Sequence, residues 1–310
     1  DLLITCPSII TIKKYFKDCQ VSLVCSDKNY SYAKRLKLFD QIYKFPKKSI
    51  IKKLFFIKIL KRKKFDYIFV FDGKERSIIV SKFIKANFKV ALTSNIKKYY
   101  RFTDIMFLVN NTSKKINEIF QEALSLCKIN VKIEHYNFLK MIEDNKYSSF
   151  IPIKNYIHIH LDEKWFSNLY ISKYTDIKPE YEEFIDFINT VSEKKNILIT
   201  SGSGSFLLIE ELKAKYFEEK SNNIFIKKNF DNFVYFADKT TFYDIESLLR
   251  NSDILIACHG AITHAANSFD VIKIDIIEKD KEVFYKKFTG HLDNYNSIYR
   301  EDFILLKKTL

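Results

Sequence analysis

The sequence predicts an α/β fold in which parallel sheets are covered by helices and arranged in two domains. Short apolar runs that suit buried strands alternate with helix-like segments along the 310 residues. The net charge also changes sign along the chain. Residues 1–150 hold 31 Lys and Arg against 13 Asp and Glu, whereas residues 151–310 hold 21 against 25. We therefore expect a basic domain over residues 1–150 and a mildly acidic domain over residues 151–310.

The composition is that of a globular protein in a reducing compartment. Hydrophobic residues make up 47% and charged residues 29% of the chain, and no apolar run is long enough for a transmembrane helix. The five cysteines are odd in number and lack C-x-x-C spacing, which argues against a disulfide framework or a zinc ribbon. The sequence starts at Asp1 rather than at a methionine, so we expect that an upstream segment has been removed.

In residues 1–150 the clearest strand is Asp66–Phe71, whose apolar core Tyr-Ile-Phe-Val-Phe is followed by the turn Asp72-Gly73. The predicted strands are Val21–Cys25, Gln41–Phe45, Asp66–Phe71, Phe88–Leu92 and Ile105–Val109, and the predicted helices are 2–16, Ser31–Leu38, Arg76–Ala86 and 114–127.

In residues 151–310 the clearest unit runs from Asp253 to Ile277, as a buried strand, a turn at His259-Gly260, a short helix and a second strand. The predicted strands are Tyr156–Leu161, Asn196–Thr200, Val234–Phe236, 254–257 and 271–277, the predicted helices are Tyr181–Val191, Phe206–Tyr216, Phe242–Arg250 and 261–268, and residues 280–310 are also predicted to be helical.

Glycines mark the turns where a ligand could approach the backbone. Three of the five, Gly202, Gly204 and Gly260, fall in predicted strand-to-helix turns of the second domain. The segment 201–205, Ser-Gly-Ser-Gly-Ser, is neither a P-loop nor a complete dinucleotide fingerprint. Together with His259-Gly260 it indicates a nucleotide site in the second domain. The alternative is that His259-Gly260 is an ordinary turn whose glycine serves only its geometry.

The segment Lys44–Lys64 is the most basic part of the chain and also carries many bulky apolar residues. This mixture fits an amphipathic helix that lies on an anionic membrane surface. The alternative is a surface helix with one face in the core, as any packed helix has. No recognisable nucleic-acid module accompanies the basic charge, so we expect no nucleic-acid partner.

The order of these features resembles the heptosyltransferase-like family 9 of glycosyltransferases along nearly the whole chain. The matching segments are Asp1–Ile9, Phe65–Ser77, Tyr156–Trp165, Ile197–Gly204 and Asp253–Val271. The resemblance implies a GT-B fold, with two Rossmann-like βαβ domains facing across a cleft. It places a first strand before Asp1, and it allows the last helix to pack back on the first domain.

The resemblance implies an inverting, metal-independent glycosyltransferase without a cofactor. Such an enzyme would move a sugar, with heptose as one candidate, from a nucleotide-sugar to lipopolysaccharide or another anionic cell-envelope glycan or glycolipid. It would work in the cytoplasm, at the inner face of the cytoplasmic membrane. This chain has His259-Gly260-Ala261 where the family mostly has Asp-Ser-Gly, which leaves the donor open. The alternative is a GT-B-like protein that binds a nucleotide-sugar or glycan without catalysis.

The family's motifs also imply the site residues. Asp1 matches the base that takes the proton from the acceptor hydroxyl, and Lys164 is the candidate cation for the leaving diphosphate, although most lysines are simply solvated. The other implied donor-binding residues are Thr200, Gly202, Gly204, Thr241, His259, Gly260, Ala261, Thr263 and His264, and the implied acceptor-binding residues are Asp72, Gly73 and Arg76.

Four histidines raise the question of a metal site. His158 and His160 alternate on a predicted strand, and His259 and His264 follow a later strand of the same sheet. No set of Asp and Glu ligands accompanies them, so we predict no metal site.

Overall fold

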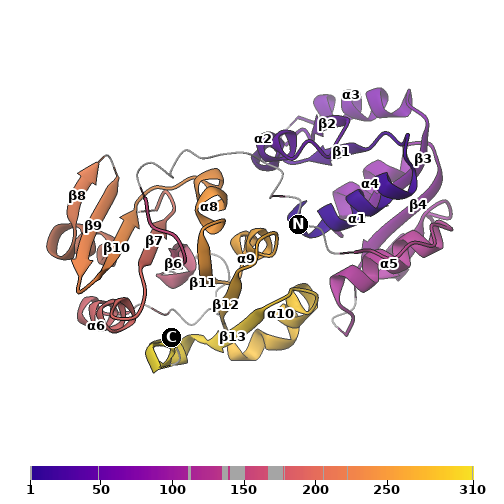
Figure 1. Ribbon diagram of the computed structural model, residues 1–310. Helices are drawn as coiled ribbons and strands as arrows, with labels where there is room; N and C mark the ends of the chain where they lie inside the picture. The colour runs from indigo at the N-terminus through magenta and orange to yellow at the C-terminus, as the bar shows by residue number, and fades with distance from the viewer. Residues whose placement is uncertain are drawn as a thin grey trace. The chain divides into compact units, whose positions relative to one another are not determined.

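The computed structural model describes residues 2–47, 49–110, 113–134, 139, 151–166, 177, 179–204, 206–221, 223–308 and 310. The chain forms two compact units (Figure 1). Unit 1 comprises Asp1–Tyr136 and Lys286–His291, and unit 2 comprises Asn137–Tyr285 and Leu292–Leu310. The division near residue 136 precedes the boundary expected from the charge distribution, and a short C-terminal segment belongs with unit 1.

Unit 1 contains two parallel sheets, β1-β2 and β3-β4-β5. Its helices and strands are α1 (Leu2–Tyr15), β1 (Ser22–Cys25), α2 (Asp27–Arg35), β2 (Gln41–Lys44), α3 (Ile50–Lys61), β3 (Phe65–Val70), α4 (Glu75–Lys82), β4 (Ala86–Thr93), the 3-10 helix η1 (Ile96–Tyr99), β5 (Met106–Val109) and α5 (Ile116–Leu126). The alternation of strands and helices predicted for residues 1–150 is confirmed, with boundaries shifted by a few residues.

Unit 2 contains a single sheet of eight strands in the order β13-β12-β11-β6-β7-β10-β9-β8 (Figure 1). The six strands from β13 to β10 are parallel, and β9 and β8 extend that sheet in an antiparallel manner. The strands are β6 (Tyr156–Leu161), β7 (Ile197–Ser201), β8 (Glu218–Ser221), β9 (Ile224–Asn229), β10 (Asn232–Ala237), β11 (Ser252–Cys258), β12 (Ile272–Ile277) and β13 (Tyr295–Tyr299).

Helices cover both faces of the unit 2 sheet, which explains why β6 is buried along its whole length. Phe184 and Phe187 of α6 pack on the face formed by residues such as Ile157 and Ile199. Leu248 of α8 packs on the opposite face. The helices are η3 (Glu163–Trp165), α6 (Tyr181–Ser192), α7 (Leu207–Glu211) with the π turn η4 (Leu212–Tyr216), α8 (Phe242–Leu249), α9 (Ala261–Ala266), η5 (Lys279–Lys281), α10 (Glu282–Thr289) and η6 (Arg300–Lys308). From Lys286 onward, α10 belongs to unit 1.

The prediction that residues 280–310 are helical is wrong in part, because β13 lies within this segment and pairs with β12. Its sequence, Tyr-Asn-Ser-Ile-Tyr, is an edge strand with polar residues facing water, and so it lacks the continuous apolar run of a buried strand. The antiparallel pair β8 and β9 was also not predicted, because lysines and glutamates dominate this exposed end of the sheet.

The strand order of unit 2 creates a switch point between β6 and β11. From β6 the chain proceeds to β7 and β10 on one side, and it then returns to β11 and β12 on the other side. Connections therefore leave the carboxyl ends of β6 and β11 in opposite directions. In open parallel sheets a crevice forms at this place, and ligands bind there.

Candidate functional site

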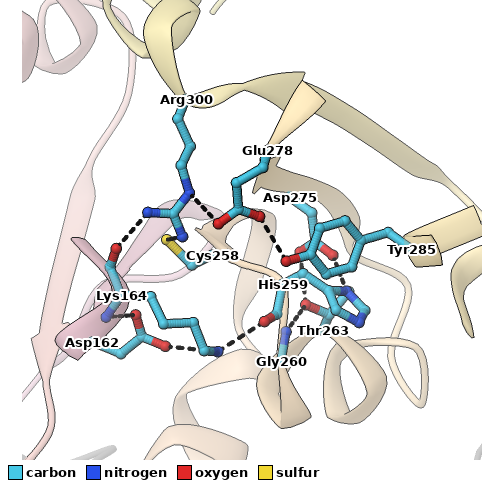
Figure 2. Close-up of polar contacts among 10 residues, drawn as sticks. All are labelled: Asp162, Lys164, Cys258, His259, Gly260, Thr263, Asp275, Glu278, Tyr285 and Arg300. Atoms are coloured by element: carbon cyan, nitrogen blue, oxygen red, sulfur yellow. Dashed lines mark hydrogen bonds and ion pairs between the residues drawn. The ribbon is translucent and has the colours of Figure 1, made fainter. Parts of the chain in front are cut away.

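The loops after β6 and β11 bring Lys164 and His259 together at the switch point. Nζ of Lys164 donates a hydrogen bond to the backbone oxygen of His259 at 2.8 Å, and it lies 3.1 Å from Oδ2 of Asp162 (Figure 2). Gly260 is adjacent, and a Cβ atom on it would lie 2.8 Å from Nζ of Lys164. A glycine is therefore needed at position 260 for the lysine to keep this place.

Lys164 stays charged although it is largely buried. Burial is the largest single influence and would lower its pKa, but the nearby acidic groups, with Asp162 first among them, together outweigh burial, so the pKa lies above its ordinary value. An ammonium group has three N–H donors. Within the part of the chain that the structure describes, its contacts with Asp162 and His259 occupy two of them. One donor is left to bind an anion at the strand ends.

His259 is held by a buried carboxylate on the neighbouring strand. Its Nδ1 lies 2.6 Å from Oδ2 of Asp275 on β12, and the hydroxyl of Thr263 donates to Oδ1 of the same residue at 2.6 Å. Asp275 is fully buried, whereas His259 reaches the surface. This pairing fixes Nδ1 toward the sheet, so that Nε2 is the imidazole nitrogen available for other contacts. Figure 2 shows these residues in one group with Gly260.

A buried ion pair supports the loop that carries Lys164. Nε of Arg300 lies 3.1 Å from Oε1 of Glu278, and another guanidinium nitrogen donates to the backbone oxygen of Lys164 at 2.7 Å. Tyr285 donates its hydroxyl to Oε2 of Glu278, and its ring packs 4.9 Å from the ring of His259. Three elements near the end of the chain thus hold both sides of the switch point in place (Figure 2).

Thr200, predicted to bind the donor, is fully buried, and its hydroxyl group contacts two histidines on β6. Its hydroxyl oxygen lies 2.8 Å from Nε2 of His158 and 2.9 Å from Nδ1 of His160. Burial lowers the pKa of His158 to about 3 and that of His160 to about 4, so both rings are neutral. Among the described residues, no three His, Cys, Asp or Glu side chains are grouped so that they could hold a metal ion.

The other predicted donor residues lie on neighbouring strand ends of the same sheet. Gly202 and Gly204 follow β7, and a Cβ atom at Gly202 would meet no atom within 4 Å, so the chain is open there. Thr241 caps α8 by accepting a hydrogen bond from the backbone of Asp244. Ala261 and His264 lie on α9, the six-residue helix that follows Gly260. Whether these residues bind a ligand stays a prediction.

The predicted acceptor residues lie in unit 1, after strand β3. Asp72 accepts hydrogen bonds from the backbone of Lys74 and from the hydroxyl of Ser77, and Gly73 has a left-handed φ of 61°. The guanidinium group of Arg76 lies 5.6 Å from the ring centre of Phe45. Asp72 and Arg76 are exposed. Asp1, the predicted base, lies outside the residues that the structure describes.

Five residues of the site were not anticipated from the sequence: Asp162, Asp275, Glu278, Tyr285 and Arg300. Asp275 had a visible signal, because it interrupts the apolar, mostly β-branched run 271–277 of a strand that is buried on both faces. A carboxylate in such a strand needs a partner. Arg300 gave no local signal, since its role depends on β13 lying next to β12.

Solved structures that align with this chain include glycosyltransferases and a UDP-GlcNAc 2-epimerase. A glycosyl transferase of family 9 from Veillonella parvula aligns with a TM-score of 0.65 and 13% identity, over 99% of this chain and 85% of that one. The E. coli heptosyltransferase WaaC with ADP-2-deoxy-2-fluoro heptose gives 0.65 and 10%, over 96% and 89%. The UDP-GlcNAc 2-epimerase from Methanocaldococcus jannaschii gives 0.55 and 9%, over 100% and 89%.

The chain has the GT-B fold. It resembles family 9 glycosyltransferases in structure along nearly its whole length, as the sequence motifs predicted. No family model matches the sequence. No curated protein matches it either. At these low identities the GT-B fold is what the structural match establishes. No helix in the described parts of the chain is long and apolar enough to cross a membrane.

Proposed function

We propose that the protein is a glycosyltransferase that binds a nucleotide-sugar in unit 2, with the diphosphate against Lys164 at the switch point. The observation that carries the proposal is the meeting of Lys164 with the His259-Gly260 turn at the carboxyl ends of β6 and β11. The lysine is charged, fixed on one side by Asp162, and left with a donor for an anion. A preorganised cation of this kind stabilises the negative charge that develops on a leaving diphosphate.

The proposed reaction is an inverting transfer. The acceptor hydroxyl attacks the anomeric carbon, the bond from that carbon to the diphosphate breaks, and a base takes the hydroxyl proton. Asp1 is proposed as this base because it matches the family motif. Lys164 and the backbone N–H groups after His259 receive the leaving diphosphate, which makes a metal ion unnecessary. The imidazole of His259, held at Nδ1 by Asp275, can donate from Nε2 to the same group when it is protonated.

The proposed acceptor is an anionic glycan or glycolipid of the cell envelope that binds unit 1 near Asp72, Gly73 and Arg76. The basic charge of residues 1–150 supports an anionic acceptor, because it raises the local concentration of such a molecule. We place the enzyme at the inner face of the cytoplasmic membrane. Heptose is one candidate sugar. The enzymes with the most similar structures include a heptosyltransferase solved with an ADP-heptose analogue.

A thermal-shift screen of nucleotide-sugars tests donor binding. A ligand at about 100 times its dissociation constant should stabilise the native state by about 2.7 kcal/mol. The donor found in this way is then incubated with and without envelope glycans. A transferase releases nucleoside diphosphate only when an acceptor is present, and the new bond has the opposite anomeric configuration. If no nucleotide-sugar stabilises unit 2, the proposal is wrong.

Two other outcomes of this experiment identify the alternatives. Conversion of the sugar to an epimer without an acceptor would assign the protein to the epimerases, whose GT-B structures it also matches. Binding without turnover with any acceptor would indicate a non-catalytic protein. The Asp1→Asn variant then tests the base, because it should abolish transfer and leave donor binding nearly intact. Full activity of that variant would show that Asp1 is not the base. In a separate test, retained activity of the unchanged protein in EDTA would support a reaction without a metal ion.

A further inference from the structure

Helix α3 has two apolar faces, and only one of them is used in the core. Phe56 and Leu60 are buried in a cluster with Ile84. This cluster is the core face that any surface helix needs. Five other large apolar residues of the helix are at least 37% exposed, and only Ile57 is partly buried. The five are Ile50, Ile51, Leu54, Phe55 and Ile59. A helix that served only the packing of unit 1 would have polar side chains at these positions.

The exposed apolar side chains are contiguous and form a shallow groove. Exposed Ile51, Leu54 and Phe55 follow one another within a little more than one turn, and Leu54 and Phe55 are exposed by 62% and 64%. The groove is lined by Pro46, Ile51, Lys52, Phe55, Phe56 and Ile59. Contiguous exposed apolar surface of this kind marks a site of interaction with a protein or a membrane.

Lysines alternate with these apolar residues along the helix, and no acidic residue lies in its stretch of sequence. No Asp or Glu occurs between Asp40 and Asp66 in the sequence. The lysines of the helix are Lys52, Lys53, Lys58 and Lys61. Within the part of the chain that the structure describes, no carboxylate pairs with any of these four lysines. Their charge therefore acts on whatever approaches the apolar surface.

We propose that α3 docks the protein on an anionic phospholipid bilayer. Ile51, Leu54 and Phe55 enter the acyl region, while the lysines extend along the helix so that their ammonium groups reach the phosphates. A second copy of the chain fits this surface less well, since a symmetric contact would bring two unpaired sets of lysines together. Nucleic acid would use the lysines but would leave Ile51 and Leu54 in water.

The docking does not rest on the proposed transfer reaction. Vesicle binding is measured without donor or acceptor, so the failure of one proposal leaves the other standing. If both hold, α3 brings unit 1 to the membrane where a glycolipid acceptor would lie.

Vesicle cosedimentation of the full chain tests the proposal. We expect binding to vesicles of phosphatidylcholine with about one third phosphatidylglycerol, and at least tenfold weaker binding to pure phosphatidylcholine. Raising the NaCl concentration from about 0.1 M to about 0.5 M should weaken binding to the anionic vesicles severalfold, because salt screens the lysines.

Two variants separate the apolar and the electrostatic contributions. The double variant Leu54→Ser/Phe55→Ser keeps every charge and should bind at least tenfold more weakly, because it loses the inserted side chains. The double variant Lys52→Gln/Lys58→Gln should bind about tenfold more weakly and depend less on salt. Both changes are on the surface, and circular dichroism should show unchanged helix content.

The matched controls are Phe230→Ser and Lys194→Gln, which remove an exposed phenylalanine and an exposed lysine of unit 2. They should bind vesicles like the unchanged protein. Full vesicle binding by Leu54→Ser/Phe55→Ser would overturn the proposal. Two other results would also overturn it. The first is self-association of the unchanged protein, seen in sedimentation without vesicles, that Leu54→Ser/Phe55→Ser abolishes. The second is binding to duplex DNA that is stronger than vesicle binding and that the Ser substitutions do not change.

Discussion

The two units use positive charge in opposite ways. On α3 of unit 1 three of the four lysines are exposed, and all four lack carboxylate partners among the described residues and alternate with apolar side chains. At the switch point of unit 2, Lys164 is largely buried and is fixed between Asp162 and the backbone of His259. Exposed cations attract any anionic surface and are screened by salt. A buried cation that is held in place selects one ligand geometry.

Burial, rather than the number of charges, therefore distinguishes a specific binding site from a surface that attracts anions in general. Unit 2 is slightly acidic in sequence, and yet it holds the better candidate for a diphosphate site. Its buried polar groups include His158, His160, Asp275 and Arg300. Each of them affects the stability of unit 2 as well as its chemistry, because a buried polar group that loses its partner costs free energy.

Acid should destabilise unit 2 through its buried histidines. Burial lowers the pKa of His158 to about 3 and that of His160 to about 4, whereas unfolded imidazoles titrate near about 6.5. The unfolded state therefore takes up protons that the native state does not. The stabilisation is complete above about pH 6.5 and is lost as the pH falls toward about 4. Between about pH 7 and pH 5 the free energy of unfolding should fall by about 4 kcal/mol.

The fluorescence of Trp165 can follow this unfolding in urea, because Trp165 is the only tryptophan of the chain and is fully buried in unit 2. The variants His158→Gln and His160→Asn place an amide where the imidazole nitrogen contacts Thr200. Each should reduce the dependence on pH by about half. An unchanged dependence in both variants would show that other groups cause it.

Removal of the Lys164 ammonium group should weaken donor binding about 100-fold in the variant Lys164→Met. The effect is large because the cation is fixed in a partly dry site, where its field is weakly screened. Isothermal titration with the nucleotide-sugar identified by the screen measures the change. Lys194→Met removes an exposed lysine of the same unit and should leave the affinity unchanged. If Lys164→Met and Lys194→Met bind the nucleotide-sugar with equal affinity, the buried lysine contributes no more to donor binding than the exposed one.

Loss of the Thr200 hydroxyl should destabilise unit 2 by about 2 kcal/mol in the variant Thr200→Val, because two buried imidazoles lose one partner each. The midpoint of urea unfolding, read from Trp165, measures the loss. Thr190→Val is the matched control, since the Thr190 hydroxyl bonds only to its own helix and is partly exposed. A loss no greater than in the control would mean that water replaces the hydroxyl.

The smallest effect is expected for Gly260→Ala. The backbone at Gly260 is extended, so alanine fits it, but the new Cβ atom would displace Nζ of Lys164 from its place 2.8 Å away. We expect a change in unfolding free energy below about 0.5 kcal/mol and a threefold to tenfold loss of donor affinity, or about 1 kcal/mol. In the double variant with Lys164→Met, the alanine should cause no further loss, since the displaced group is absent.

Local patterns predicted most of the fold and the turns that carry the candidate site. Fully buried strands such as β6 and β11 are continuous apolar runs, and turns such as His259-Gly260 interrupt them, so both are visible in the sequence. The same approach missed β13, since an edge strand with polar residues looks like a loop or a helix end. It could not find the contact of Arg300 with the backbone of Lys164, because this contact depends on how distant segments meet. The helix within Lys44–Lys64 was predicted, but the sequence left open whether its apolar residues face the core or a membrane.

The assignment of Lys286–His291 to unit 1 has a consequence for dissecting the protein. Neither unit is one continuous length of chain, since this segment is flanked on both sides by unit 2. Phe288 packs beside Leu92 and Ile116, and Lys287 donates to Asn110. A fragment that ends at Tyr136 would lack these partners, and one that ends at Tyr285 would lack β13. The protein therefore suits fragment complementation, in which a cleaved N-terminal piece folds fully only after it recaptures six residues from the other piece.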